Sequence, residues 1–117
     1  MRLAVTSDLH LPRTPAGVIE GMVPDLAAHA PDAAVLAGDL GESSEDSKPC
    51  LRLFRKLACP VLVLAGNHDL FPGRAGSRQL WRHVLPETVR QLGFHWLEGE
   101  PFVRGGVAVA GTVAWYD

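Results

Sequence analysis

The sequence lacks long apolar runs and has no large excess of charge of either sign. No apolar run approaches the roughly 20 residues that a membrane helix needs, and the opening apolar stretch turns polar at residues 6–8, too early for a secretory signal. We therefore expect a cytoplasmic protein. Its 11 Lys and Arg against 13 Asp and Glu give a formal charge of -2, which provides no general attraction to nucleic acid or anionic lipid.

Cysteine is also scarce. Cys50 and Cys59 form neither a Cys-x-x-Cys pair nor a framework of four or more, which argues against a disulfide scaffold and a zinc ribbon. We expect both to be reduced residues that contribute to packing. With 117 residues, 47% of them hydrophobic and 21% charged, the chain has the composition of a globular domain. No repeat, low-complexity tract or linker divides it, so we take residues 1–117 as one domain.

Three short apolar runs, over residues 3–6, 33–37 and 60–65, predict strands that are buried on both faces. Apolar residues at helical spacing between them predict helices over 16–30, where Pro24 is expected to break or kink the helix, and over 47–57. Strands that alternate with helices are typical of a parallel sheet. We therefore expect an α/β fold that begins βαβαβ.

The remaining part of the chain predicts a mixture of elements. The pattern favours a loop over residues 71–78, followed by a broken helical segment over 79–84 and 86–91. A fourth strand is predicted over 94–97, and a tight hairpin joins 102–104 to 107–110. We expect the sheet to continue past Ala110.

Each of the first three predicted strands is followed by residues of metal-ligand type. Asp8 and His10 follow the first, and residues two apart in an extended segment point to the same side, so both could reach one cation. Taken alone, Asp8 is better explained as a helix cap or turn residue, and His10 as an ordinary loop histidine.

The second and third strands have similar endings. Gly38 and Asp39 follow the second, where Gly38 permits a sharp turn or close approach and Asp39 offers two oxygens, enough to bridge two ions. Gly66-Asn67-His68-Asp69 follows the third. Polar turns favour Gly, Asn and Asp, but turn chemistry does not account for the histidine.

Open parallel sheets place their sites at the carboxyl ends of the strands, so these residues are expected to lie together. Their oxygen and nitrogen donors suit Mn, Fe or Zn better than Ca. The set expected to converge comprises Asp8, His10, Asp39, Asn67 and His68.

The order of these motifs closely resembles that of the calcineurin-like metallophosphoesterases, whose opening motifs are Asp-x-His, Gly-Asp and Gly-Asn-His-Asp or Gly-Asn-His-Glu. The resemblance covers nearly the whole chain. It implies that the chain forms the parallel βαβαβ half of an α/β/β/α sandwich. It also implies a reaction that uses two divalent metal ions to hydrolyse a phosphomonoester or phosphodiester.

The resemblance also implies a role for each motif residue. Asp8 and His10 are expected to bind the first ion. Asp39 is expected to bridge both ions and Asn67 to bind the second. His68 is expected to help protonate the leaving group.

The chain departs from the family pattern after these motifs. The family completes its site with a further histidine and a Gly-His-x-His motif, and neither occurs before Asp117. His29 and His83 fall in predicted helices and His95 in a segment that looks structural, so we do not expect them to act as replacements. The chain is therefore expected to be a truncated domain with an incomplete site.

Some basic and aromatic residues could add to the site. Arg13 and Arg74 follow two of the motifs and could contact a substrate phosphate, although solvated loop arginines are common. The tryptophans are expected to pack in the core or at an edge, since the chain lacks the basic groove of single-strand binding proteins. They are Trp81, Trp96 and Trp115.

Two kinds of function fit these observations. The first is a metal-dependent phosphoesterase whose ions activate water for attack on phosphorus. The second is a non-catalytic module that binds a metal or a phosphorylated ligand; an inactive truncated fragment is a further alternative. An incomplete sandwich is also expected to expose apolar sheet surface and to self-associate.

Overall fold

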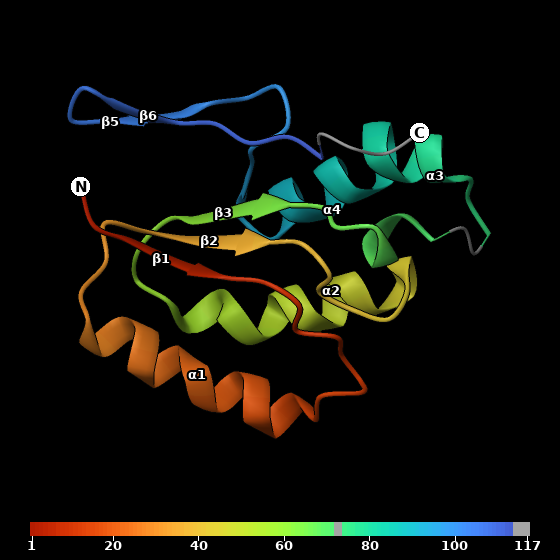
Figure 1. The fold of residues 1–117 in the computed structure, drawn as a ribbon, viewed down its shortest axis with the longest axis horizontal. Coiled ribbons are helices and arrows are strands. Elements are labelled where there is room, and N and C mark those ends of the chain that lie inside the picture. Colours follow the sequence, from red (N-terminus) through yellow and green to blue (C-terminus); the bar gives the residue numbers. More distant parts are fainter. Residues whose placement is uncertain (72–73, 114–117) are drawn as a thin grey trace.

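The computed structural model describes residues 1–71 and 74–113, and it shows a parallel sheet with helices on one face and a hairpin on the other (Figure 1). Strands β1 (Leu3–Thr6), β2 (Ala33–Ala37), β3 (Val61–Leu64) and β4 (His95–Trp96) lie side by side in chain order. All three pairings are parallel. The predicted α/β fold is confirmed.

Helical crossovers join the strands. Helix α1 (Ala16–Ala28) links β1 to β2, and α2 (Ser44–Leu53) with a 3-10 turn (Phe54–Lys56) links β2 to β3. Between β3 and β4 lie a 3-10 turn (His68–Leu70), α3 (Ser77–Gln79), a π-helical turn (Leu80–Val84) and α4 (Leu85–Gln91). None of these described helices is long and apolar enough to cross a membrane.

Two helix boundaries differ from the prediction. Pro24 lies inside α1, which continues to Ala28, so of the predicted break or kink the helix shows no break. Helix α2 begins at Ser44, three residues before the predicted start. The earlier start is stabilised by Ser43, whose backbone N–H and hydroxyl both donate to the Asp46 carboxylate, at 3.1 and 2.9 Å.

The main core lies between the sheet and the helices. Alternate residues of β2 and β3, such as Leu36 and Val63, face the helices and are almost fully buried, as is Trp96 of β4. From the helices, Ile19, Phe54 and Val89 pack against them. The prediction that Trp96 packs in the core is confirmed.

The other side chains named for packing lie around this core. Trp81 is partly buried and packs against it. Trp115 lies outside the described residues. Cys50 is buried in the core, Cys59 packs at its margin, and both are free thiols, as predicted.

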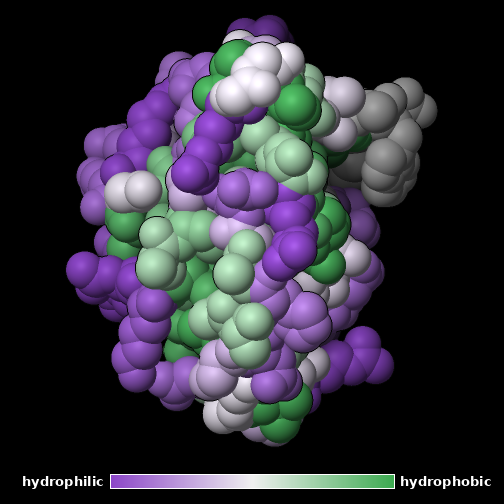
Figure 2. Space-filling view, turned by 90° about the vertical axis from the view of Figure 1, so that its left-hand side faces the viewer, coloured by the Kyte–Doolittle hydropathy of each residue, from purple (hydrophilic) through white to green (hydrophobic). Residues whose placement is uncertain are grey.

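Strand β1 is exposed, which contradicts the prediction that it is buried on both faces. Leu3 and Val5 are 39% and 63% exposed. The reason is that β1 is an edge strand, and its second face receives little cover. Figure 2 views the left-hand side of Figure 1 and shows hydrophobic residues at the surface among hydrophilic ones.

The second face of the sheet carries a smaller apolar cluster. It contains Ala33, Val35, Leu62 and Leu97. The antiparallel hairpin of β5 (Phe102–Arg104) and β6 (Val107–Val109) covers part of it, through Phe102 and Val109. The hairpin forms a separate sheet, and beyond Ala110 the described chain makes one parallel bridge, between Gly111 and Glu98.

Candidate metal centre

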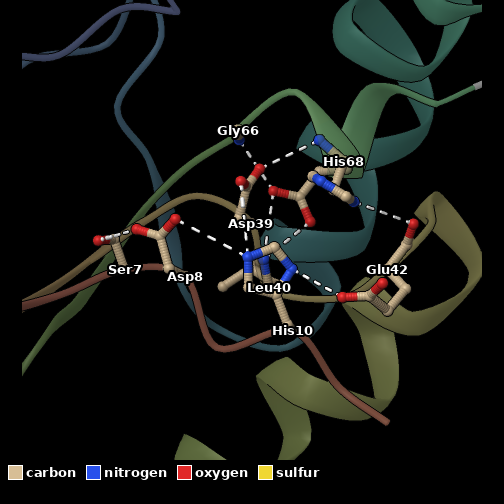
Figure 3. Close-up of polar contacts among 9 residues, drawn as sticks. Ser7, Asp8, His10, Asp39, Leu40, Glu42, Gly66 and His68 are labelled. Atoms are coloured by element: carbon tan, nitrogen blue, oxygen red, sulfur yellow. Dashed lines mark hydrogen bonds and ion pairs between the residues drawn. The ribbon is translucent and has the colours of Figure 1, made fainter. Parts of the chain in front are cut away.

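The carboxyl ends of β1, β2 and β3 bring together the five site residues expected to converge. Figure 3 shows Asp8, His10 and Asp39 around a common point, with His68 beside them. The rings of His10 and His68 meet edge to face, with centroids 4.8 Å apart. The structure therefore places these side chains at one edge of the sheet, where a parallel sheet carries its binding sites.

The segment after β1 is not extended as predicted. Asp8 and His10 have φ angles of 56° and 50°, in the left-handed region. Backbone hydrogen bonds hold this conformation, because the Asp8 N–H donates to the Gly38 carbonyl at 3.1 Å and the His10 N–H to the Asp39 carbonyl at 3.0 Å. The two side chains converge because the loop is held against the end of β2.

Asp39 is the central carboxylate of the cluster. His10 Nε2 lies 3.8 Å from Asp8 Oδ1 and 3.9 Å from Asp39 Oδ2, and one atom from each of these residues lies within 4.8 Å of the others. Two atoms that bind one ion at roughly 2.0–2.2 Å lie at most about 4.4 Å apart. The two spacings from His10 therefore fit a divalent cation.

The cluster is most exposed at Asp8. The side chains of His10 and Asp39 are 21% and 15% exposed, whereas that of Asp8 is 68% exposed. Its accessible side is formed by Asp8, where a substrate could approach from solvent. Ser7 donates a hydrogen bond to the other Asp8 oxygen.

Residues 67 and 68 approach Asp39 from β3. The His68 N–H donates to Asp39 Oδ1 at 3.0 Å. One end of the Asn67 amide lies 3.2 Å from both Asp39 oxygens. If that end is the amide nitrogen, it donates hydrogen bonds to the Asp39 carboxylate. If it is the amide oxygen, it faces only acceptor atoms, and a cation between Asn67 and Asp39 would stabilise that arrangement.

Asp69 is a structural residue of this centre and has no exposed surface. Its carboxylate accepts hydrogen bonds from the Gly66 N–H at 2.8 Å, the Ser47 hydroxyl at 2.9 Å and the Leu40 N–H at 3.1 Å. Burial raises the pKa of this carboxyl group, against the effect of these hydrogen bonds. Asp69 thus ties the loops after β2 and β3 to α2.

Glu42 is the site residue that the sequence analysis missed. Its Oε1 lies 2.8 Å from His10 Nδ1, and its backbone carbonyl lies 3.3 Å from His68 Nδ1. Together with the two histidines it forms a second group whose ligand atoms lie within 4.8 Å of one another. The available signal was a carboxylate three residues after Asp39, in the same loop.

The other residues considered for the site make no side-chain hydrogen bond or ion pair with this cluster in the described part of the chain. Arg13 and Arg74 are exposed, and neither makes an ion pair or side-chain hydrogen bond with another described residue. His29 contacts the Asp25 carbonyl, and His95 contacts the Glu100 carbonyl. His83 is exposed in the π-helical turn.

The family model described as calcineurin-like phosphoesterase matches residues 1–112. The chain belongs to the calcineurin-like phosphoesterases. One relative of this phosphoesterase is a protein of Synechococcus sp. named "Probable cyclic nucleotide phosphodiesterase". It is 35% identical over 83 residues, which cover 59% of this chain and 31% of the relative.

A solved structure shares the fold of this phosphoesterase. It is the crystal structure of phosphopantetheinyl hydrolase from Mycobacterium tuberculosis, with a TM-score of 0.62 and 24% identity, over 89% of this chain and 38% of that one. The chain therefore spans about a third of the length of these two proteins.

Proposed function

We propose that this calcineurin-like phosphoesterase hydrolyses a phosphate ester with a metal-activated water. The observation that carries the proposal is the approach of Asp8, His10 and Asp39 to one point, at spacings that fit a divalent ion. When bound, divalent ions of this kind lower the pKa of water and neutralise charge on phosphoryl oxygens. No nucleophilic side chain is then required.

Two ions would be held by different residues of the cluster. Asp8 and His10 would hold one, and Asp39 would be shared between both. Asn67 would contribute its amide oxygen to the second. The donor set supports Mn, Fe or Zn, because it mixes imidazole with oxygen ligands.

His68 is proposed as the general acid. Its Nδ1 lies against the Glu42 carbonyl at 3.3 Å and its backbone N–H is bound to Asp39, so the ring is held beside the cluster. When the ring carries a proton on both nitrogens, Nδ1–H can donate a hydrogen bond to the Glu42 carbonyl while Nε2 passes its proton to a leaving oxygen, which leaves a neutral imidazole. Phe71 supports the ring from one side, with centroids 4.5 Å apart.

We propose that the substrate is a phosphodiester, in preference to a phosphomonoester. Support comes from the Synechococcus relative, whose name gives a phosphodiesterase acting on cyclic nucleotides. Arg13 and Arg74 are proposed to contact the phosphate, since both are free of intramolecular ion pairs with described residues. Several expectations from the sequence remain predictions. They are a cytoplasmic location, a single domain over residues 1–117, the lack of a general nucleic-acid surface, and self-association through exposed sheet residues.

A non-catalytic module that binds a metal or a phosphorylated ligand is the second candidate. It is favoured by the ligand count, because the described residues offer three side chains to one ion but only Asp39 and Asn67 to the second. Hydrolysis that needs both ions would then be weak in this chain, whereas binding at the first site would persist.

The experiment is hydrolysis of a chromogenic phosphodiester with added Mn²⁺. The chain is compared with Asp39→Asn and with Asp25→Asn, a control at an exposed position of α1. Circular dichroism verifies that all three are folded. Turnover that requires Mn²⁺ and is lost only in Asp39→Asn supports the phosphoesterase. Background rates in all three, with Mn²⁺ still bound, favour the binding module.

A further inference from the structure

Glu42 makes a contact that the proposed reaction does not explain. Its Oε1 and His10 Nδ1 lie 2.8 Å apart, and both atoms are buried with no other partner among the described residues. This short contact does not meet standard hydrogen-bond geometry. Burying two polar atoms without partners is costly, so a small rotation that pairs them with each other is favoured.

The contact determines which nitrogen of His10 faces the candidate metal centre. Figure 3 shows Glu42 on the far side of the His10 ring from Asp8. Nε2 is the atom that faces Asp8 and Asp39, at 3.8 and 3.9 Å. In a neutral imidazole one nitrogen is a donor and the other an acceptor, so a proton on Nδ1 toward Glu42 leaves the Nε2 lone pair available.

The backbone of Glu42 is fixed independently of this contact. The Glu42 N–H donates to the Leu11 carbonyl at 3.0 Å, and the Leu11 N–H donates to the Leu40 carbonyl at 3.1 Å. These bonds join the loop that carries His10 to the loop that carries Glu42. The Glu42 backbone is therefore held beside the loop that carries His10 by bonds that need no metal.

We propose that Glu42 is a positioning residue that holds His10 with its proton on Nδ1 and its Nε2 directed to Asp8 and Asp39. The effect of Glu42 on metal affinity rests on the proposed function. Its effect on the orientation of the His10 ring does not depend on that function. A carboxylate behind a metal-binding histidine fixes the tautomer and raises the basicity of the ligand.

A direct metal ligand is the competing role for Glu42, since Glu42, His10 and His68 could themselves surround an ion. The geometry favours positioning, because Glu42 Oε1 contacts the ring nitrogen that points away from Asp8 and Asp39. A site on Glu42 would need His10 to present Nδ1 instead of Nε2.

The test is the tautomer of His10 in metal-free protein, read from the ring ¹⁵N shifts by NMR at a pH where imidazole is neutral. The signal is assigned with a His10→Gln variant. We expect the Nδ1–H form in the wild type and in Glu42→Gln, whose amide oxygen still accepts. Glu42→Ala should lose it, and the exposed control Glu45→Ala should keep it. An unchanged tautomer in Glu42→Ala overturns the proposal.

Mn²⁺ affinity of the same variants gives the second readout. Glu42→Ala should weaken binding by about 10–100-fold, the usual effect of losing such a partner, and Glu42→Gln by much less. Equal losses in both variants would assign Glu42 as a ligand and overturn the positioning role. If the tautomer follows Glu42 but no variant binds Mn²⁺, the positioning of His10 stands and the proposed metal-dependent function fails.

Discussion

Gly38 and Gly66 meet so closely that neither has room for a side chain. A Cβ on Gly38 would lie 2.3 Å from the Gly66 amide nitrogen, and a Cβ on Gly66 would lie 2.1 Å from Asp39 Oδ1. Gly38 also has a φ angle of 89°, which L side chains rarely adopt. This approach of two backbones places the Asp39 carboxylate against the loop that carries Asn67 and His68.

Substitution at this contact should destabilise the fold. Gly66→Ala and Gly38→Ala are each expected to lower the free energy of unfolding by about 2–4 kcal/mol, through overpacking and, at Gly38, left-handed backbone strain. Urea denaturation measures the change. Gly21→Ala in α1 is the matched control, since its Cβ would meet nothing within 4 Å, and it should stabilise by about 0.5–1 kcal/mol. Equal stability of all three variants would contradict the close-approach argument.

Asp69 should be important for stability although it is not a proposed ligand. Asp69→Ala would leave the N–H groups of Leu40 and Gly66 without their acceptor, and we expect a loss on the order of 3 kcal/mol. Ser47→Ala removes one donor and should cost about 1–2 kcal/mol. The measurement is again urea denaturation, without metal. A loss no larger for Asp69→Ala than for Ser47→Ala would argue against Asp69 as the common acceptor of these loops.

The two thiols should react at very different rates. Burial, with the nearby Asp69 and Asp46 carboxylates, raises the pKa of Cys50 to about 12, so the thiolate population near neutral pH is on the order of 1 in 10⁴ or less. Ellman's reagent should therefore modify only Cys59 in the folded protein and both thiols after unfolding. Cys59→Ser should remove the early phase, whereas Cys50→Ala should retain it. Two fast equivalents in the folded wild type would contradict the buried position of Cys50.

The sequence predicts the strands and the site motifs because both depend on local patterns. Short apolar runs ended by polar residues mark β1, β2 and β3 without reference to the rest of the fold. The rule that parallel strands carry sites at their carboxyl ends then brings Asp8, Asp39 and His68 together. The structure places these side chains at one edge of the sheet, and their role as a site stays a prediction.

Features that depend on tertiary contacts could not be predicted in this way. The exposure of Val5 follows from the place of β1 at the edge of the sheet, which an apolar run does not reveal. The left-handed backbone of Asp8 and His10 is imposed by hydrogen bonds to the loop after β2. No periodic pattern in the sequence marks Glu42. Its carboxylate lies behind His10 only because the loops that carry the two residues meet in the fold.

Binding of Mn²⁺, followed by electron paramagnetic resonance, tests the central claim most directly. The claim is that Asp8, His10 and Asp39 form a metal centre at the end of the sheet. We expect the wild type and the surface control Asp25→Asn to bind Mn²⁺ with equal affinity, and Asp39→Asn to bind at least about 10-fold more weakly. Equal affinity of Asp39→Asn and the wild type, or no binding by any of the three folded proteins, would contradict the metal centre.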